Sequence, residues 1–128
     1  IKHHYRFPNI RTEYILNAQT YKNDLLEILN KYKRSERRIW FVNHINGLGM
    51  KETSHFLRNI GYRDYAIIDT HILSLLQKHR IINKQKTITK NVYLHIERKL
   101  EVLAQKTGLD LAALDLYLWY IQTGMILK

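Results

Sequence analysis

Apolar residues recur every three or four positions along most of the chain, a spacing that places them on one face of an α-helix. Strand-like alternation of apolar and polar residues is scarce, so the pattern predicts an all-α protein. The predicted helices cover residues 11–19, 23–32, 35–45, 50–60, the apolar run after Asp69, residues 92–106, and a last segment from Leu111 through Tyr120. The first ten residues, which contain Pro8, and the basic stretch 84–90 are predicted to be irregular.

Polar residues and glycines mark where these helices begin and end. Ser35, Asp69 and Asp110 each come just before an apolar helical run, so each is predicted to be an N-cap. Gly61 and Gly108 follow helical runs and are predicted to stop them. The chain has no internal repeat and no linker rich in Gly, Pro or Ser, which predicts one domain over its whole length.

The chain is strongly basic and contains no cysteine. Its 128 residues include 21 Lys or Arg and 11 Asp or Glu, a formal net charge of +10, which favours a polyanionic partner. The absence of cysteine excludes disulfides, iron–sulfur clusters, zinc ribbons and a cysteine nucleophile, and the seven histidines form no ligand-spaced cluster, so no transition metal and no cofactor are expected. No apolar run is long enough to span a membrane, and we expect a cytoplasmic protein.

Two predicted helices are joined by Gly47-Leu48-Gly49, which predicts a tight turn with exposed backbone N–H groups. The second helix begins directly after this turn, and its positive N-terminal end suits a phosphate group. A simple helix–helix turn is the structural alternative for a glycine pair taken alone.

Lys51 and Asp69 are the two candidates for chemistry. Lys51 falls in the first turn of a helix, where its charge opposes the helix dipole and where burial would favour the neutral amine that attacks carbon. Asp69 follows two isoleucines and precedes a helix, a position that suits a cap and also a fixed catalytic carboxylate. A solvated surface lysine and a purely structural cap remain the alternatives.

Three segments in this order resemble one family of DNA repair enzymes. Residues 45–62 (INGLGMKETSHFLRNIGY) resemble the helix-hairpin-helix of base-excision DNA glycosylases. Residues 66–73 (AIIDTHIL) resemble the segment that carries the family's catalytic aspartate, and residues 114–128 resemble its C-terminus. The match is closest to the archaeal-type, or type 2, 8-oxoguanine DNA glycosylase/AP lyases, and it implies a helix-hairpin-helix helical bundle.

This resemblance implies a role for several residues. Lys51 would attack C1′ of the damaged nucleotide and form a Schiff base, and β-elimination would then cleave the strand. Asp69 would assist the amine and stabilise the oxocarbenium-like sugar. Trp119 would lie at the base pocket, and the C-terminal Lys128 would help recognise the oxidised base. The carbonyls of the hairpin (Gly47, Leu48, Gly49) would hold a monovalent cation that bridges to a DNA phosphate.

Other residues are weaker candidates. His55, His71 and Arg58 are supporting candidates near the nucleotide, the aspartate and the DNA backbone, respectively. The basic run formed by Lys33, Arg34, Arg37 and Arg38 would face DNA or form a solvated helix face. Tyr117 and Tyr120 lie in an apolar helix and are predicted to pack in the core.

The family usually carries a further helical segment before the part that begins here, so the chain is expected to lack it and to act as a monomer or paired with a separate N-terminal segment. The leading hypothesis is a bifunctional glycosylase and lyase that acts on 8-oxoguanine in double-stranded DNA. A non-catalytic helix-hairpin-helix module that binds DNA is the second hypothesis. A basic helical module that binds proteins, in which Lys51 is incidental, is the third.

Overall fold

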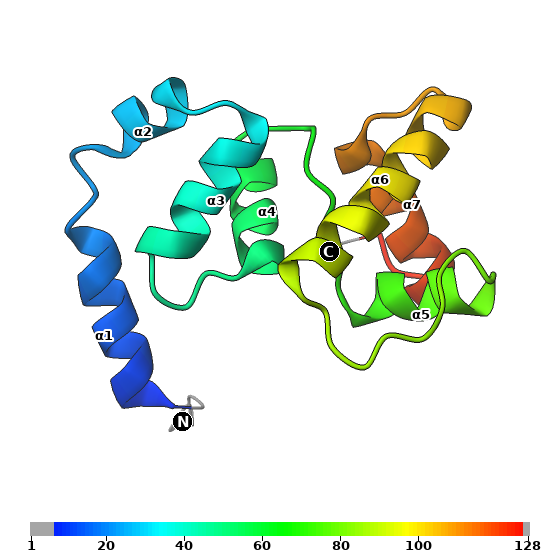
Figure 1. Cartoon of the computed structure of the whole chain (residues 1–128), viewed down its shortest axis with the longest axis horizontal. Helices are drawn as coiled ribbons and strands as arrows, with labels where there is room; N and C mark the ends of the chain where they lie inside the picture. The colour runs from blue at the N-terminus through cyan, green and yellow to red at the C-terminus, as the bar shows by residue number, and fades with distance from the viewer. Residues whose placement is uncertain (1–6, 127–128) are drawn as a thin grey trace. The chain divides into compact units, whose positions relative to one another are not determined.

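A computed structural model describes residues 7–126 of the chain (Figure 1), and this part contains seven α-helices and no strand. The helices are α1 (Pro8–Gln19), α2 (Leu25–Lys31), α3 (Arg34–His44), α4 (Met50–Asn59), α5 (Thr70–Lys78), α6 (Lys90–Thr107) and α7 (Leu111–Thr123). The prediction of an all-α protein is confirmed. No described helix is long and apolar enough to cross a membrane.

The chain divides into two compact units between Gly49 and Met50, so the hairpin turn ends the first unit and α4 begins the second. The prediction of one domain over residues 1–128 stays a prediction.

The first unit begins with a helix whose start differs from the sequence prediction. Pro8 occupies the first turn of α1 instead of keeping this part irregular, because a proline there lacks only an N–H that would have no helical partner. Ser35 is likewise not an N-cap: α3 begins at Arg34, with Lys33 at the cap position and no side-chain cap. Both errors concern helix boundaries.

Aromatic side chains cluster around Trp40 in the first unit, in which α2 packs against α3. The Trp40 ring stacks on His44 with centroids 4.3 Å apart, and Tyr21 and Phe41 contact it edge-on at 5.2 and 5.3 Å. These contacts bury Phe41 and hold the end of α3, which leads directly into the hairpin turn.

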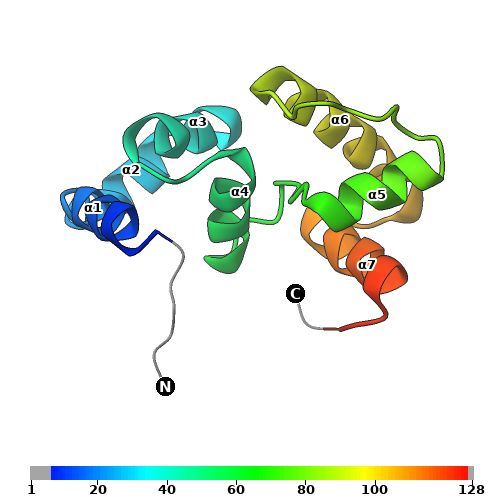
Figure 2. The ribbon, with the colours of Figure 1, turned by 90° about the horizontal axis from the view of Figure 1, so that it is seen from below.

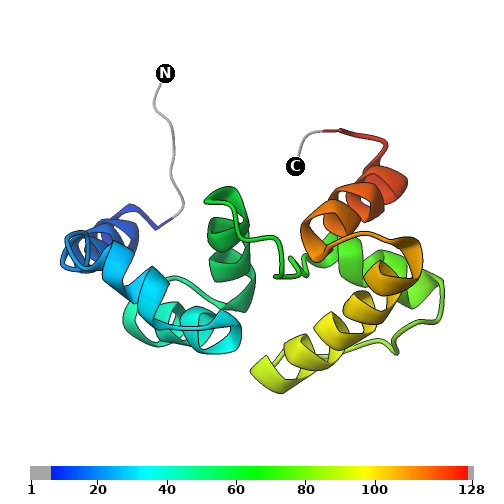
Figure 3. The same cartoon turned by 90° about the horizontal axis from the view of Figure 1, so that it is seen from above.

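The second unit is built around the pairing of α5 with α7 and of α6 with α7 (Figures 2 and 3). Its core contains Ile72, Leu76, Ile96 and Leu114, and Met50 at the start of α4 packs against it. The lysine that follows Met50 is therefore attached to a helix anchored in this core.

The predicted caps of α5 and α7 are confirmed. Asp69 Oδ1 accepts the N–H of Ile72 at 2.9 Å, and Asp110 Oδ1 accepts the N–H of Ala113 at 2.8 Å. Gly108 ends α6 in the left-handed conformation that glycine adopts without strain.

Asp110 also binds Arg63, whose guanidinium donates to both carboxylate oxygens at 2.5 and 3.1 Å. The hydrogen bond from Arg63, followed by that from Ala113, holds the pKa of Asp110 below its usual range. Because the folded pKa is the lower one, the resulting stabilisation is present above the unfolded pKa and is lost as the pH falls through the folded value. Both side chains are well exposed, so solvent screening keeps this contribution small.

Candidate active site

The hairpin turn is anchored to α1 within the first unit. The N–H of Asn46, just before the turn, donates to Asn17 Oδ1 at 2.9 Å. The N–H of Leu48, within the turn, donates to the carbonyl of Ile45 at 3.2 Å. Gly47 has a φ of +85°, and a Cβ at this position would overlap the Tyr14 ring. Only glycine fits there, for conformational and steric reasons together.

Lys51 lies in the first turn of α4, as the sequence predicts. Its side chain is 47% exposed, and Nζ lies 3.4 Å from Glu52 Oε1. The burial that would favour a neutral amine is therefore not present in the DNA-free chain, and the amine is reachable from solvent.

Asp69 is placed by a buried segment that joins α4 to α5. Residues 65–68 are extended and at most 3% exposed, and Asp69 emerges from them half-buried at the start of α5. The hydrogen bond from Ile72 fixes the carboxylate at the N-terminus of α5. A carboxylate held in this way keeps one orientation when a positive charge develops beside it.

Two side chains of α6 hold the segment before Asp69, and the sequence analysis missed both. Glu97 Oε2 accepts the N–H of Ala66 at 2.9 Å, and the Tyr93 hydroxyl donates to the carbonyl of Ala66 at 2.7 Å. The same hydroxyl accepts the N–H of Ile68 at 3.1 Å. The available signal was their spacing: Tyr93 and Glu97 are four residues apart, so both lie on the buried face of α6 with Ile96 and Leu100.

His71 and Trp119 connect α5 to α7. Their ring centroids lie 4.8 Å apart in an edge-to-face contact with an interplanar angle of 88°. His71 comes two residues after Asp69, so the helix that carries the candidate carboxylate also contacts the candidate base-stacking ring. His55 lies half-buried on α4.

Arg58 has an internal role instead of the predicted position at the DNA backbone. Its guanidinium lies 2.6 Å from Asp115 Oδ2, and the two side chains are only 12% and 4% exposed. The pair joins α4 to α7. On α4, Arg58 directly follows Leu57, which is fully buried. A charge enclosed in this way is not presented to a phosphate.

One member of the basic run is buried, and another is half-buried. Arg38 is 1% exposed, and Arg37 Nε donates to the carbonyl of Leu29 at 2.9 Å. The run is therefore not the uninterrupted basic face that its sequence suggests. A helix buries part of its circumference, and consecutive charged residues cannot all avoid that part.

Tyr117 and Tyr120 are exposed by 60% and 53%, so the prediction that they pack in the core is wrong. The buried side of α7 is formed instead by Leu111, Leu114 and Leu118. Apolar residues surround this helix, and the sequence pattern therefore could not tell its inner face from its outer face. Lys128 lies outside the described residues.

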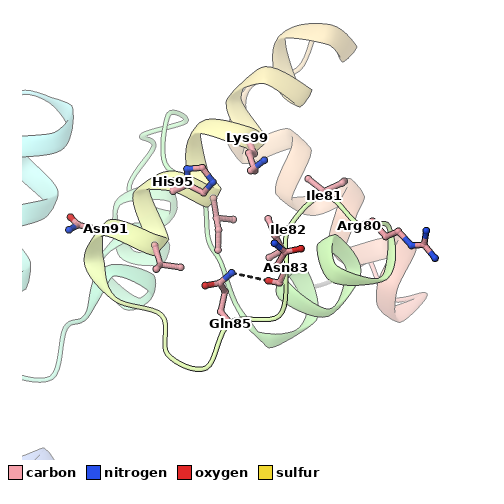
Figure 4. Close-up of a pocket in the computed structure, with 10 residues that line it drawn as sticks. Arg80, Ile81, Ile82, Asn83, Gln85, Asn91, His95 and Lys99 are labelled. Carbon is pink, nitrogen blue, oxygen red and sulfur yellow. Dashed lines mark hydrogen bonds between the residues drawn. The ribbon is translucent and has the colours of Figure 1, made fainter.

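A cavity of about 370 Å³ lies between α6 and the loop after α5 (Figure 4). His95 and Lys99 line it from α6, and Asn83 and Gln85 line it from the loop. None of Lys51, Asp69 and Trp119 lines this cavity. Within residues 7–126, no group of three or more His, Asp or Glu side chains is arranged to hold a metal ion.

A family model described as 8-oxoguanine DNA glycosylase matches residues 1–109, which include the hairpin, Lys51, Asp69 and Tyr93. The chain belongs to this family. Its helix-hairpin-helix glycosylase fold, predicted from the sequence, is thereby confirmed, since the described helices have the same arrangement as solved members of the family.

Curated relatives and solved structures agree with this assignment. The chain is 47% identical to an 8-oxoguanine DNA glycosylase/AP lyase of Korarchaeum cryptofilum over 127 residues, which cover 97% of this chain and 60% of that protein. A crystal structure of the Methanocaldococcus jannaschii 8-oxoguanine glycosylase/lyase, in complex with a 15-mer DNA containing 8-oxoguanine, matches with a TM-score of 0.90 and 42% identity and covers 98% of this chain and 61% of that one. The glycosylase of Thermotoga maritima matches with a TM-score of 0.86 and 36% identity over 96% of this chain and 59% of that one. The chain thus spans about three fifths of the length of these relatives.

The internal role of Arg58 is testable by a double-mutant cycle with Asp115. Arg58→Ala leaves a buried carboxylate without its ion-pair partner and is expected to lower the free energy of unfolding by about 3 kcal/mol. The double substitution to alanine is expected to cost less than the sum of the two single ones. Urea denaturation measures these values. Unchanged stability together with a loss of DNA affinity would instead place Arg58 at the DNA.

Proposed function

We propose that this protein removes 8-oxoguanine from double-stranded DNA and then cleaves the strand by β-elimination. The observation that carries the proposal is the placement of Lys51 and Asp69 at the N-terminal ends of two helices of one compact unit, within the part of the chain that matches the glycosylase family. The related Methanocaldococcus jannaschii enzyme supports the substrate, since its crystal structure holds DNA with 8-oxoguanine.

The proposed reaction begins at the Lys51 amine. Neutral Nζ attacks C1′, the bond from C1′ to the base breaks, and the base leaves with the bonding electrons and takes up a proton. Asp69 carries the negative charge that stabilises the cationic sugar and accepts the proton that the attacking amine loses. The sugar ring then opens to an imine with Lys51, and loss of a C2′ proton expels the 3′ phosphate.

In this proposal, bound DNA completes the active site. A base must leave the duplex at a cost of a few kcal/mol before C1′ is reachable, and phosphate contacts offset that cost. We assign these contacts to the hairpin Gly47-Leu48-Gly49 and to a monovalent cation on its carbonyls. Trp119 would stack on the flipped base, and Lys128 would help recognise the oxidised base. This function places the protein with chromosomal DNA, in the cytoplasm.

A non-catalytic DNA-binding module is the second candidate, because the Lys51 side chain is 47% exposed and its amine is open to solvent in the described structure. Such a module would keep the hairpin and the positive charge but would not form a covalent intermediate.

Borohydride trapping distinguishes the two candidates. With duplex DNA containing 8-oxoguanine, the wild-type chain is expected to form a covalent adduct, and Lys51→Gln is expected to reduce it about a thousandfold because no amine remains to form the imine. Lys90→Gln, which changes the first residue of α6, is the matched control and should trap normally. DNA binding by the wild-type chain without any adduct would support the non-catalytic module.

Asp69→Asn separates the charge of this residue from its capping role. Asparagine caps a helix about as well as aspartate, so the free energy of unfolding should change by less than about 0.5 kcal/mol. Base excision in single-turnover assays should nevertheless fall about 100-fold, because the amide cannot accept a proton or balance the sugar cation. Asp110→Asn makes the same change at the cap of α7 and should leave excision unchanged. Full activity of Asp69→Asn would remove this carboxylate from the mechanism.

We also propose that the chain is monomeric, although α1 presents apolar side chains to solvent. This helix buries no side chain, and Ile10, Ile15 and Leu16 are 46%, 60% and 58% exposed. Sedimentation velocity over a concentration series should show one species near 15.4 kDa. The double substitution Ile15→Ser/Leu16→Ser should leave this mass unchanged. Self-association that this double substitution abolishes would assign the α1 face to a second copy of the chain.

A further inference from the structure

The segment that leads to Asp69 has an unusual position: it is extended and buried, yet it belongs to no sheet. Tyr65, Ala66, Ile67 and Ile68 are between 0% and 3% exposed. A buried backbone without strand neighbours must find other partners for its N–H and C=O groups, since leaving them unpaired is costly. Side chains of α6 provide these partners, as described above.

The hydrogen bonds of the Tyr93 hydroxyl indicate which group receives its single proton. A phenol has one proton to donate, and the 2.7 Å bond to the carbonyl of Ala66 uses it. The oxygen accepts the Ile68 N–H at 3.1 Å. Ser54 Oγ lies 3.4 Å from the same oxygen and donates its own proton to the carbonyl of Met50 at 2.7 Å. The Tyr93–Ser54 contact is a secondary hydrogen bond, longer than the one to Ala66, and it links the hydroxyl to α4.

These contacts put the Tyr93 hydroxyl against the two elements that carry the candidate catalytic groups. On one side it binds Ile68, whose next residue is Asp69. On the other side it touches Ser54, which is one helical turn after Lys51 on α4. Tyr93 is itself 2% exposed, and the core of the second unit surrounds its ring. The hydroxyl thus meets both elements from a fixed point in the core.

We propose that Tyr93 is a positioning residue for base excision: its hydroxyl sets the register of residues 66–68 and thereby holds the Asp69 carboxylate relative to the Lys51 helix. This role rests on the proposed function of Lys51 and Asp69. The residue touches neither DNA nor the reacting atoms, and it acts through the backbone of Ile68.

Tyr93→Phe removes only the hydroxyl and tests this role. The variant keeps the ring in the core but leaves the Ala66 carbonyl and the Ile68 N–H without their buried partner, so the segment shifts toward other partners. A displacement of about 1 Å at a catalytic group is enough to slow a reaction about 100-fold. We expect single-turnover excision of 8-oxoguanine to fall 10- to 100-fold, in the range of such a displacement.

The two chemical steps should respond differently. Excision needs the Asp69 carboxylate beside a developing sugar cation, whereas imine formation at a preformed abasic site starts from an aldehyde and needs mainly the Lys51 amine. Borohydride trapping on abasic DNA and the dissociation constant for DNA are therefore expected to change less than about threefold in Tyr93→Phe.

Ile96→Val is the matched control. Ile96 lies three residues after Tyr93 on the same helix and is 1% exposed, so the substitution loosens the same core without touching a hydrogen bond of residues 66–68. It should lower the thermal midpoint and leave the ratio of excision to abasic-site trapping at the wild-type value. Amide hydrogen exchange at Ile68 should accelerate in Tyr93→Phe beyond its rate in Ile96→Val.

The outcomes separate this inference from the function on which it rests. A wild-type chain that excises 8-oxoguanine, with Tyr93→Phe and Ile96→Val giving the same ratio of the two activities, would overturn the positioning role alone. A wild-type chain that neither excises nor traps would overturn the proposed function, and the role of Tyr93 with it. Selective loss of excision in Tyr93→Phe supports both.

Discussion

Residues 65–68 cross the interior of the second unit as an extended chain, and their backbone is satisfied by Tyr93 and Glu97 of α6. Elsewhere in the described chain, backbone groups are paired largely within helices, which need no outside help. This segment, which belongs to no helix, depends on tertiary partners for its hydrogen bonds. Since it leads directly to Asp69, the position of the candidate carboxylate depends on two side chains about 25 to 30 residues later in the sequence.

Part of the positive charge lies inside the fold. The chain has a formal net charge of +10, yet two of its arginines are largely buried. Arg58 joins α4 to α7 through Asp115, and Arg38 is almost fully buried. Net charge still draws the protein toward a polyanion, because long-range attraction depends on the sum. Which cations can meet that polyanion depends on which ones the fold leaves outside.

Both candidate catalytic groups stand at helix N-termini, with different consequences. For Asp69 the position is favourable, since its carboxylate accepts a backbone N–H and complements the helix dipole. For Lys51 the position is unfavourable, since its positive charge opposes the helix dipole. Its side chain is 47% exposed, so the amine is reachable from solvent.

The sequence by itself determined what local chemistry controls. Helical periodicity identified the helices, Asp69 and Asp110 were identified as caps because capping needs only neighbours within one turn, and three ordered motifs identified the glycosylase family. The tertiary structure decided which face of each helix is buried. It exposed Tyr117 and Tyr120 on the uniformly apolar α7, enclosed Arg58, and brought Tyr93 to the segment before Asp69. A periodic pattern shows that a helix has an inner side, but contacts between distant residues select that side, and such contacts leave no mark within a local stretch of sequence.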